Sequence, residues 1–144
     1  MVWVASAIVL GILCLVAAIV VRRRRVIYAA GVFRCRLRSA SWGVESLSQR
    51  WSRTTSYAVW VHDVLVVYRG IALTKVLLFA CRFAEDLEDA PPDVRRLGPC
   101  PLLLRLRLDD GAIVEVAAPR RTCSDLVGPY VAAQLHPSER RTGR

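Results

Sequence analysis

The stretch LLLRLRLDDGAIVEVAA, residues 102–118, carries the clearest fold signal in the chain. Leucines alternate with arginines over 102–108, and valines alternate with Glu115 over 112–118. A period of two places the apolar side chains on one face of a strand. Asp109-Asp110-Gly111 supplies turn chemistry between the runs, because glycine accepts a positive φ. We therefore predict a β-hairpin with one buried face.

The same alternation occurs upstream in GVFRCRLR, residues 31–38. This pattern predicts a half-buried strand with a basic outer surface made of Arg34, Arg36 and Arg38, while Phe33, Cys35 and Leu37 point inward. YAVWV (57–61) and VLVVYRG (64–70) flank His62-Asp63 and predict a second hairpin. Residues 71–83 are apolar enough for one or two further strands or a short helix, since periodicity does not decide so short a run.

Two segments interrupt these strands. Residues 39–56 are rich in Ser, Thr and Arg and predict a loop or insertion, in which Trp42 and Trp51 either cap the sheet or enter a membrane interface. Residues 85–99 predict a break, because they contain Pro91-Pro92 and Gly98-Pro99. Their acids lack the spacing of a calcium loop and predict a solvated acidic loop: Glu85, Asp86, Glu88, Asp89 and Asp93.

The last element expected is a helix within 122–135, ended by His136-Pro137. Thr122 or Ser124 could cap it. Pro129 would cost about 3 kcal/mol inside a helix, so the regular part could instead begin near Gly128-Pro129. The order is thus about five to seven hairpin-linked strands and one terminal helix. It predicts a mainly β (α+β) domain: a small antiparallel barrel or bent sheet of pleckstrin-homology type, with the helix plugging one open end.

Residues 2–21 contain no charged side chain, and Arg22, Arg23, Arg24 and Arg25 follow directly. A helix of this length spans about 30 Å, the thickness of the hydrocarbon core of a bilayer. A secretory signal peptide has its positive charge before a shorter apolar run. We therefore predict an uncleaved transmembrane anchor over 1–25, a soluble domain over 26–137 and a disordered tail over 138–144. The positive-inside rule places the N-terminus outside and the domain in the cytoplasm.

The positive charge is concentrated next to this anchor. The chain has a net charge of +9, and residues 22–56 hold nine arginines against the single acid Glu45. Arginines 22–25 are expected to set the topology, and with the arginines of 31–38 they can attract anionic head groups of the lipid bilayer. A nucleic-acid partner is not expected, because no recognised binding motif accompanies the charge.

No catalytic, cofactor-binding or metal-binding residues are predicted. His62 and Asp63 are adjacent, so on a strand they would face opposite sides. The chain has no nucleophile elbow and no glycine-rich phosphate loop. Its five cysteines have no CxxC spacing, and Cys35 and Cys81 are expected to be small core residues that stay reduced. These observations favour a protein that is not an enzyme.

These segments together resemble the actinobacterial DUF2550 family, which comprises small single-pass membrane proteins of unknown function. The resemblance rests on the anchor with its arginines and on four segments: GVFRCRLR (31–38), YAVWVHDVLVVYRGIAL (57–73), LLLRLRLDDGAIVEVA (102–117) and VAAQL (131–135). It implies a pleckstrin-homology-like domain at the plasma membrane and supplies no catalytic residues.

The function expected from these features is a membrane-tethered binding module for a protein or an anionic lipid. The alternative is an accessory subunit or assembly factor of a larger membrane complex. The sequence leaves the oligomeric state open.

Overall fold

A computed structural model describes residues 2–41, 44–94 and 96–130 of the chain. A long helix, α1 (Val2–Ile27), is followed by six strands and a short helix, α2 (Cys123–Val127), which lies between two single 3-10 turns. The strands are β1 (Phe33–Ser39), β2 (Ser56–Val61), β3 (Val64–Arg69), β4 (Lys75–Asp89), β5 (Leu102–Leu108) and β6 (Ile113–Ala118). The predicted class, an apolar N-terminal helix before an antiparallel barrel with a C-terminal helix, is confirmed.

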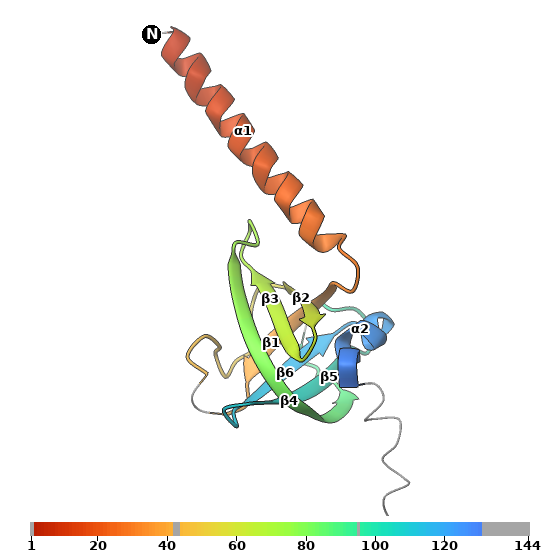
Figure 1. Ribbon diagram of the computed structural model, residues 1–144. Helices are drawn as coiled ribbons and strands as arrows, with labels where there is room; N and C mark the ends of the chain where they lie inside the picture. The colour runs from red at the N-terminus through yellow and green to blue at the C-terminus, as the bar shows by residue number, and fades with distance from the viewer. Residues whose placement is uncertain (1, 42–43, 95, 131–144) are drawn as a thin grey trace, which may run out of the picture.

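The six strands form a closed antiparallel barrel in chain order, with β6 returning to β1 (Figure 1). Two strands, β1 and β4, each pair with one neighbour along their first part and with another neighbour along their second part. The first residues of β1 pair with β2, and its residues from Arg36 onward pair with β6. The first part of β4 pairs with β3, and its second part pairs with β5 through two register shifts, one between Cys81 and Phe83 and one between Ala84 and Asp86. Such irregularities let a strand bend, so that it can belong to two sheets.

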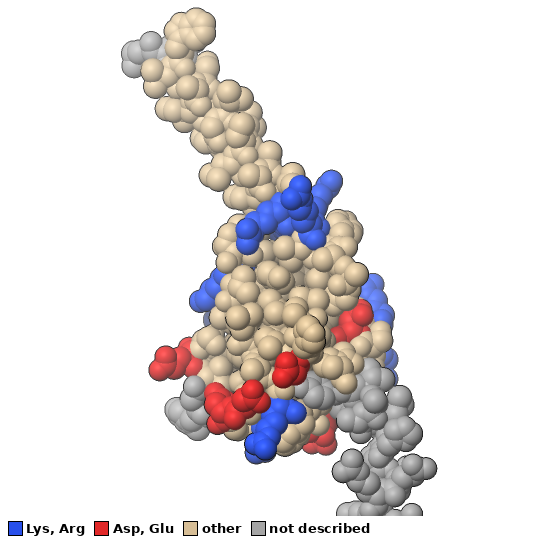
Figure 2. Space-filling model, viewed as in Figure 1, with Lys and Arg blue, Asp and Glu red and all other residues tan. Residues whose placement is uncertain are grey.

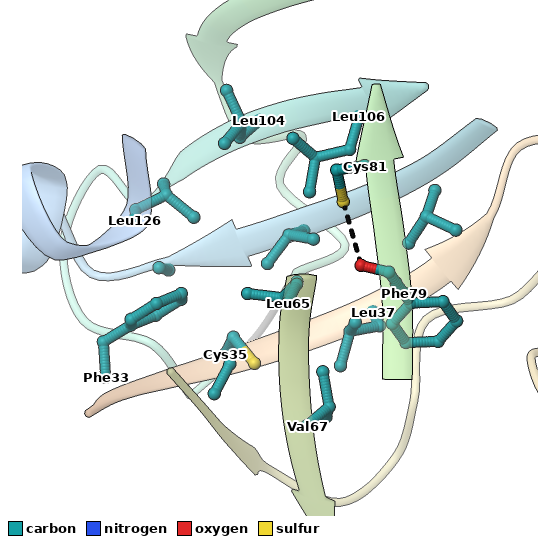
Figure 3. Packing of buried hydrophobic residues seen from close by; sticks show 14 of the residues in the cluster. Phe33, Cys35, Leu37, Leu65, Val67, Phe79, Cys81, Leu104, Leu106 and Leu126 are labelled. Carbon is teal, nitrogen blue, oxygen red and sulfur yellow. Dashed lines mark hydrogen bonds between the residues drawn. The ribbon is translucent and has the colours of Figure 1, made fainter. Parts of the chain in front are cut away.

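The inward-facing residues of all six strands fill the barrel (Figure 3). Phe33, Cys35 and Leu37 of β1 are each no more than 1% exposed, as their alternation predicts. Leu126 of α2 enters the same core from one end. The indole Nε1 of Trp60 donates a hydrogen bond to the Leu126 carbonyl over 2.9 Å and ties the helix to β2. The short helix thus covers one end of the barrel, as expected.

Helix α2 has five residues and ends at Gly128, which has a φ of 53°. A Cβ at this glycine would lie 2.3 Å from Cδ1 of Trp60, so both the backbone and the packing require glycine. Pro129 follows the helix instead of interrupting it. Thr122 precedes the helix, but its hydroxyl donates to the Pro119 carbonyl and does not cap it. Residues 131–144, which include the expected end of the helix and the tail, lie outside the described residues.

Strand β4 runs through Asp89, so the prediction of a break and a loop is wrong for 85–89, although Asp86, Glu88 and Asp89 are solvent-exposed as expected. Three of these four acids lie beside arginines of β5, and Asp89 binds Arg120. Nε of Arg107 donates to Glu85 over 2.6 Å, and Arg105 lies 3.7 Å from Glu88. Opposite charges on paired strands stabilise the pairing. Residues 71–83 contribute a turn and then the start of this one long strand, with no helix.

The loop after β4 folds back over the outer face of β1, β5 and β6. Val94 and Leu97 from this loop pack with Leu103 and Ala117 in a second, smaller apolar cluster. Trp51 from the β1–β2 connection packs against the same cluster. Trp51 therefore caps the sheet, which was one of the two expected roles, and Trp42 lies outside the described residues.

A row of three charges crosses this covered face. Glu115 of β6, 2% exposed, lies between Arg38 of β1 and Arg105 of β5, its two cross-strand neighbours. Arg38 donates a hydrogen bond to Oε2 of Glu115, and Nη2 of Arg105 donates to Oε1 over 3.0 Å. Burial by itself raises the pKa of Glu115, but the hydrogen bonds and charges of both arginines outweigh it and hold the pKa below its usual value.

We expect Glu115→Gln to lower the free energy of unfolding by about 2 kcal/mol at pH 7, because charge-assisted hydrogen bonds to a buried carboxylate are lost. Since the pKa of Glu115 is depressed in the folded state, its stabilising effect is present above the unfolded pKa, about 4.3, and is lost as the pH falls through the folded value. The measurement is urea unfolding of the full chain in neutral detergent, followed by tryptophan fluorescence from pH 7 to pH 3.

The matched control is Glu45→Gln, because Glu45 is exposed and none of the described ion pairs includes it. This control should change stability by less than about 0.5 kcal/mol. A difference between Glu115→Gln and the unsubstituted chain that stays constant over the whole pH range would contradict the role of the carboxylate.

Candidate functional site

Helix α1 contains one segment, Trp3–Ile27, that is long and apolar enough to cross a membrane, and its most apolar 18 residues have a mean hydropathy of 3.0. Its 18-residue apolar window is not buried against the rest of the described chain. A signal sequence near an N-terminus would share these properties. The helix continues through Arg22–Arg25, so all four arginines lie exposed on its last turns, where positive charge is favourable for the helix dipole. Figure 2 shows arginines gathered where the helix meets the barrel.

The three arginines of β1 do not form one exposed basic surface. Arg34 is exposed, Arg36 is only 7% exposed, and Arg38 is bound to Glu115 beneath Trp51. Nη2 of Arg36 donates to the carbonyl of Arg53 over 3.0 Å. The sequence alternation correctly placed all three outside the barrel, but the long connections then cover that face.

A hollow of about 350 Å³ lies between the end of α1 and the barrel. Arg23 comes from α1, Arg53 from the β1–β2 connection and Arg96 from the β4–β5 loop. Thr54 and Thr55 add hydroxyl groups to the lining. A neighbouring hollow of about 440 Å³ shares Arg96 and is also lined by arginines. Sequence analysis missed Arg53 and Arg96, since nothing local indicates that their segments meet.

The positive charge of this hollow is not balanced by acids. Among the described residues, the ion pairs involve Arg38, Arg105, Arg107 and Arg120, and none involves the three arginines of the hollow. Next to it, the pKa of Arg36 is lowered, first by burial and then by the positive charges of Arg96 and Arg34. The cluster therefore favours binding of an anion.

An uncharged surface covers the outside of β2, β3 and β4. Nine outward residues are paired across the three strands, carry no charge and are at least partly exposed. They form three rows: Tyr57, Tyr68 and Val76; Val59, Val66 and Leu78; Val61, Val64 and Ala80. Leu78 is the most exposed of the large ones, at 67%. In Figure 2 this uncharged face lies between the arginines of α1 and acidic side chains at its far margin.

The apolar face adjoins the anchor. Tyr68, at the top of the face, shares a hollow with Ala18, Val21 and Arg25 of α1. The β3–β4 turn rises beside the end of the helix (Figure 1), and Ile71 at that turn is 84% exposed. An exposed isoleucine and a tyrosine next to the last apolar turns of α1 are typical of a surface at a membrane interface.

His62 and Asp63 form the exposed turn between β2 and β3, where His62 has a φ of 57°. No three His, Cys, Asp or Glu side chains among the described residues are grouped so that they could hold a metal ion. None of the five cysteines forms a disulfide, and Cys35 and Cys81 lie in the core as expected.

Comparisons of the chain with protein-family models, with curated proteins and with solved structures find no match. The resemblance to DUF2550 therefore stays a prediction. The fold, the charge distribution and the exposed surfaces are the features that bear on the function of the protein.

We expect the core thiols to be unreactive in the folded chain. Burial is the main cause that raises the pKa of Cys81 to about 12, and it also raises the pKa of Cys35. Because the thiolate is the reactive form and both core thiols are buried, a water-soluble maleimide at pH 7.5 should modify exposed Cys100 much faster than Cys35 or Cys81. Peptide mass spectrometry before and after unfolding in urea measures this ratio. Equal rates for Cys81 and Cys100 would show that the barrel opens.

Proposed function

We propose that this chain is a single-pass plasma-membrane protein whose barrel is a non-catalytic binding module in the cytoplasm. The length of the apolar segment, the arginines that follow it and the positive-inside rule support an anchor with its N-terminus outside. In this arrangement the barrel is held at the inner leaflet, where the lipid surface is negatively charged.

The observation that carries this proposal is the excess of arginine at the membrane end of the barrel. Arg23, Arg53 and Arg96 make no ion pair among the described residues, and they lie beside the exposed arginines of α1. Each basic residue near an anionic membrane surface contributes about 1 kcal/mol of attraction. The barrel thus binds anionic lipid with the end that its anchor already turns toward the bilayer.

Residues 22–144, expressed without the apolar segment but with the arginines that follow it, should sediment with vesicles of phosphatidylcholine and phosphatidylglycerol and much less with vesicles of phosphatidylcholine alone. The binding should weaken as salt rises, because exposed charges are screened. Equal binding to both vesicles would contradict the proposal. Protease added outside intact cells checks the orientation, since a cytoplasmic barrel stays intact.

A second candidate function, an accessory subunit or assembly factor of a membrane complex, is favoured by the apolar face of β2, β3 and β4. Contiguous exposed apolar surface marks sites of interaction with proteins or membranes. The nine residues of this face begin beside α1 at Tyr68 and extend away from the helix. A neighbouring membrane protein could therefore contact α1 and the face together.

Under this second function, a stoichiometric protein should copurify with the full chain after extraction in mild detergent. Leu78→Asp should abolish the copurification, because it puts a charge in the middle row of the face. Leu78 is exposed, so the substitution should leave the unfolding midpoint of the barrel nearly unchanged. A partner that is retained by the Leu78→Asp chain would argue against this use of the face.

A further inference from the structure

The hollow at the membrane end is built from three segments far apart in the sequence. Arg23 lies on the last turns of α1, whereas Arg53 and Arg96 lie on connections held to the barrel. The carbonyl of Arg53 accepts a hydrogen bond from buried Arg36, and the carbonyl of Thr54 accepts one from the hydroxyl of Ser52 over 3.0 Å. The carbonyl of Arg96 accepts one from Arg34 over 3.3 Å. The backbones that carry two of the three guanidinium groups are therefore fixed before any ligand arrives.

The chemistry of the lining fits a phosphate group. Guanidinium groups offer paired N–H donors that match phosphate oxygens, and such charge-assisted hydrogen bonds are stronger than neutral ones. Thr54 and Thr55 are further possible donors. Within the described residues, no ion pair with an acid competes for these three arginines.

Part of the lining of the hollow is apolar. Leu73, which is buried, and Ile71, which is 84% exposed, both contribute to it. A free inorganic anion would leave this apolar lining in water. A phosphate that carries acyl chains would place its charge on the arginines and its apolar part along Ile71.

The position of the hollow agrees with this amphipathic ligand. Arg23 is the second residue after the uncharged segment 2–21 of α1, so it lies at the depth where lipid phosphates begin. The turn that contains Ile71 rises beside the same end of the helix (Figure 1). A lipid from the surrounding leaflet could therefore enter the hollow without leaving the membrane.

We propose that the hollow formed by Arg23, Arg53 and Arg96 is a specific site for the phosphate group of an anionic glycerophospholipid. This inference rests on the proposed function, which places the barrel at the inner leaflet. It adds that one lipid binds in a defined site, beyond the general attraction of a basic surface.

The test uses the full chain in neutral detergent, titrated with dioctanoyl phosphatidylglycerol and followed by native mass spectrometry, which counts the lipids bound. One lipid should bind with clear preference over dioctanoyl phosphatidylcholine. The double variant Arg53→Gln/Arg96→Gln should bind it at least about tenfold more weakly, because two charge-assisted contacts are lost. Titration with glycerol phosphate tests whether the phosphate alone is sufficient.

The matched control is Arg50→Gln/Arg82→Gln, which removes the same charge from exposed arginines outside the hollow. It should change the affinity less than about twofold, and its unfolding midpoint and that of the first variant should equal that of the unsubstituted chain. Equal weakening by both double variants would overturn the specific site while leaving attraction to anionic vesicles, and hence the proposed function, intact. Glycerol phosphate binding as tightly as the lipid would overturn the lipid as ligand. A chain with no preference for anionic vesicles would refute both.

Discussion

The barrel closes through backbone hydrogen bonds because two strands, β1 and β4, each pair in two sheets. A strand can do so only if it bends, and the register shifts of β4 near Cys81 and Ala84 supply that bend. Closure leaves no free strand edge to pair with another chain. It also gives the barrel two outer faces with different neighbours, and this difference determines which surfaces stay available for binding.

The two outer faces of the barrel differ in their charge and in how far the connections between strands cover them. On β1, β5 and β6, charged residues point outward, and Glu115 neutralises part of the arginine charge. Long connections pack over this face. On β2, β3 and β4, the connections are tight turns, so nothing in the described chain covers an outer face that carries no charge. The same connections that cover the first face bring Arg53 and Arg96 to the end of α1.

The location of the arginines explains why net charge alone says little about the binding surface. Several arginines neutralise acids within the fold: Arg38, Arg105, Arg107 and Arg120. Arg36 is buried against a backbone carbonyl. Among the described residues, much of the positive charge without acidic partners lies where α1 meets the barrel, on Arg22–Arg25, Arg53 and Arg96. Of the basic surface expected on β1, only Arg34 is fully exposed, because Arg36 is 7% exposed and Arg38 binds Glu115.

Five of the six strands, the apolar span and the inward residues of those strands could be predicted from the sequence alone, because an alternation with a period of two and an uncharged run of twenty residues act locally. Sequence analysis ended β4 too early, since the acids from Glu85 to Asp89 are held in the strand by Arg105, Arg107 and Arg120, which come later in the chain. The burial of Arg36 and the meeting of Arg23, Arg53 and Arg96 were decided only by the tertiary structure. Both depend on loops that reach across the closed barrel, and no local pattern encodes which segments such loops bring together.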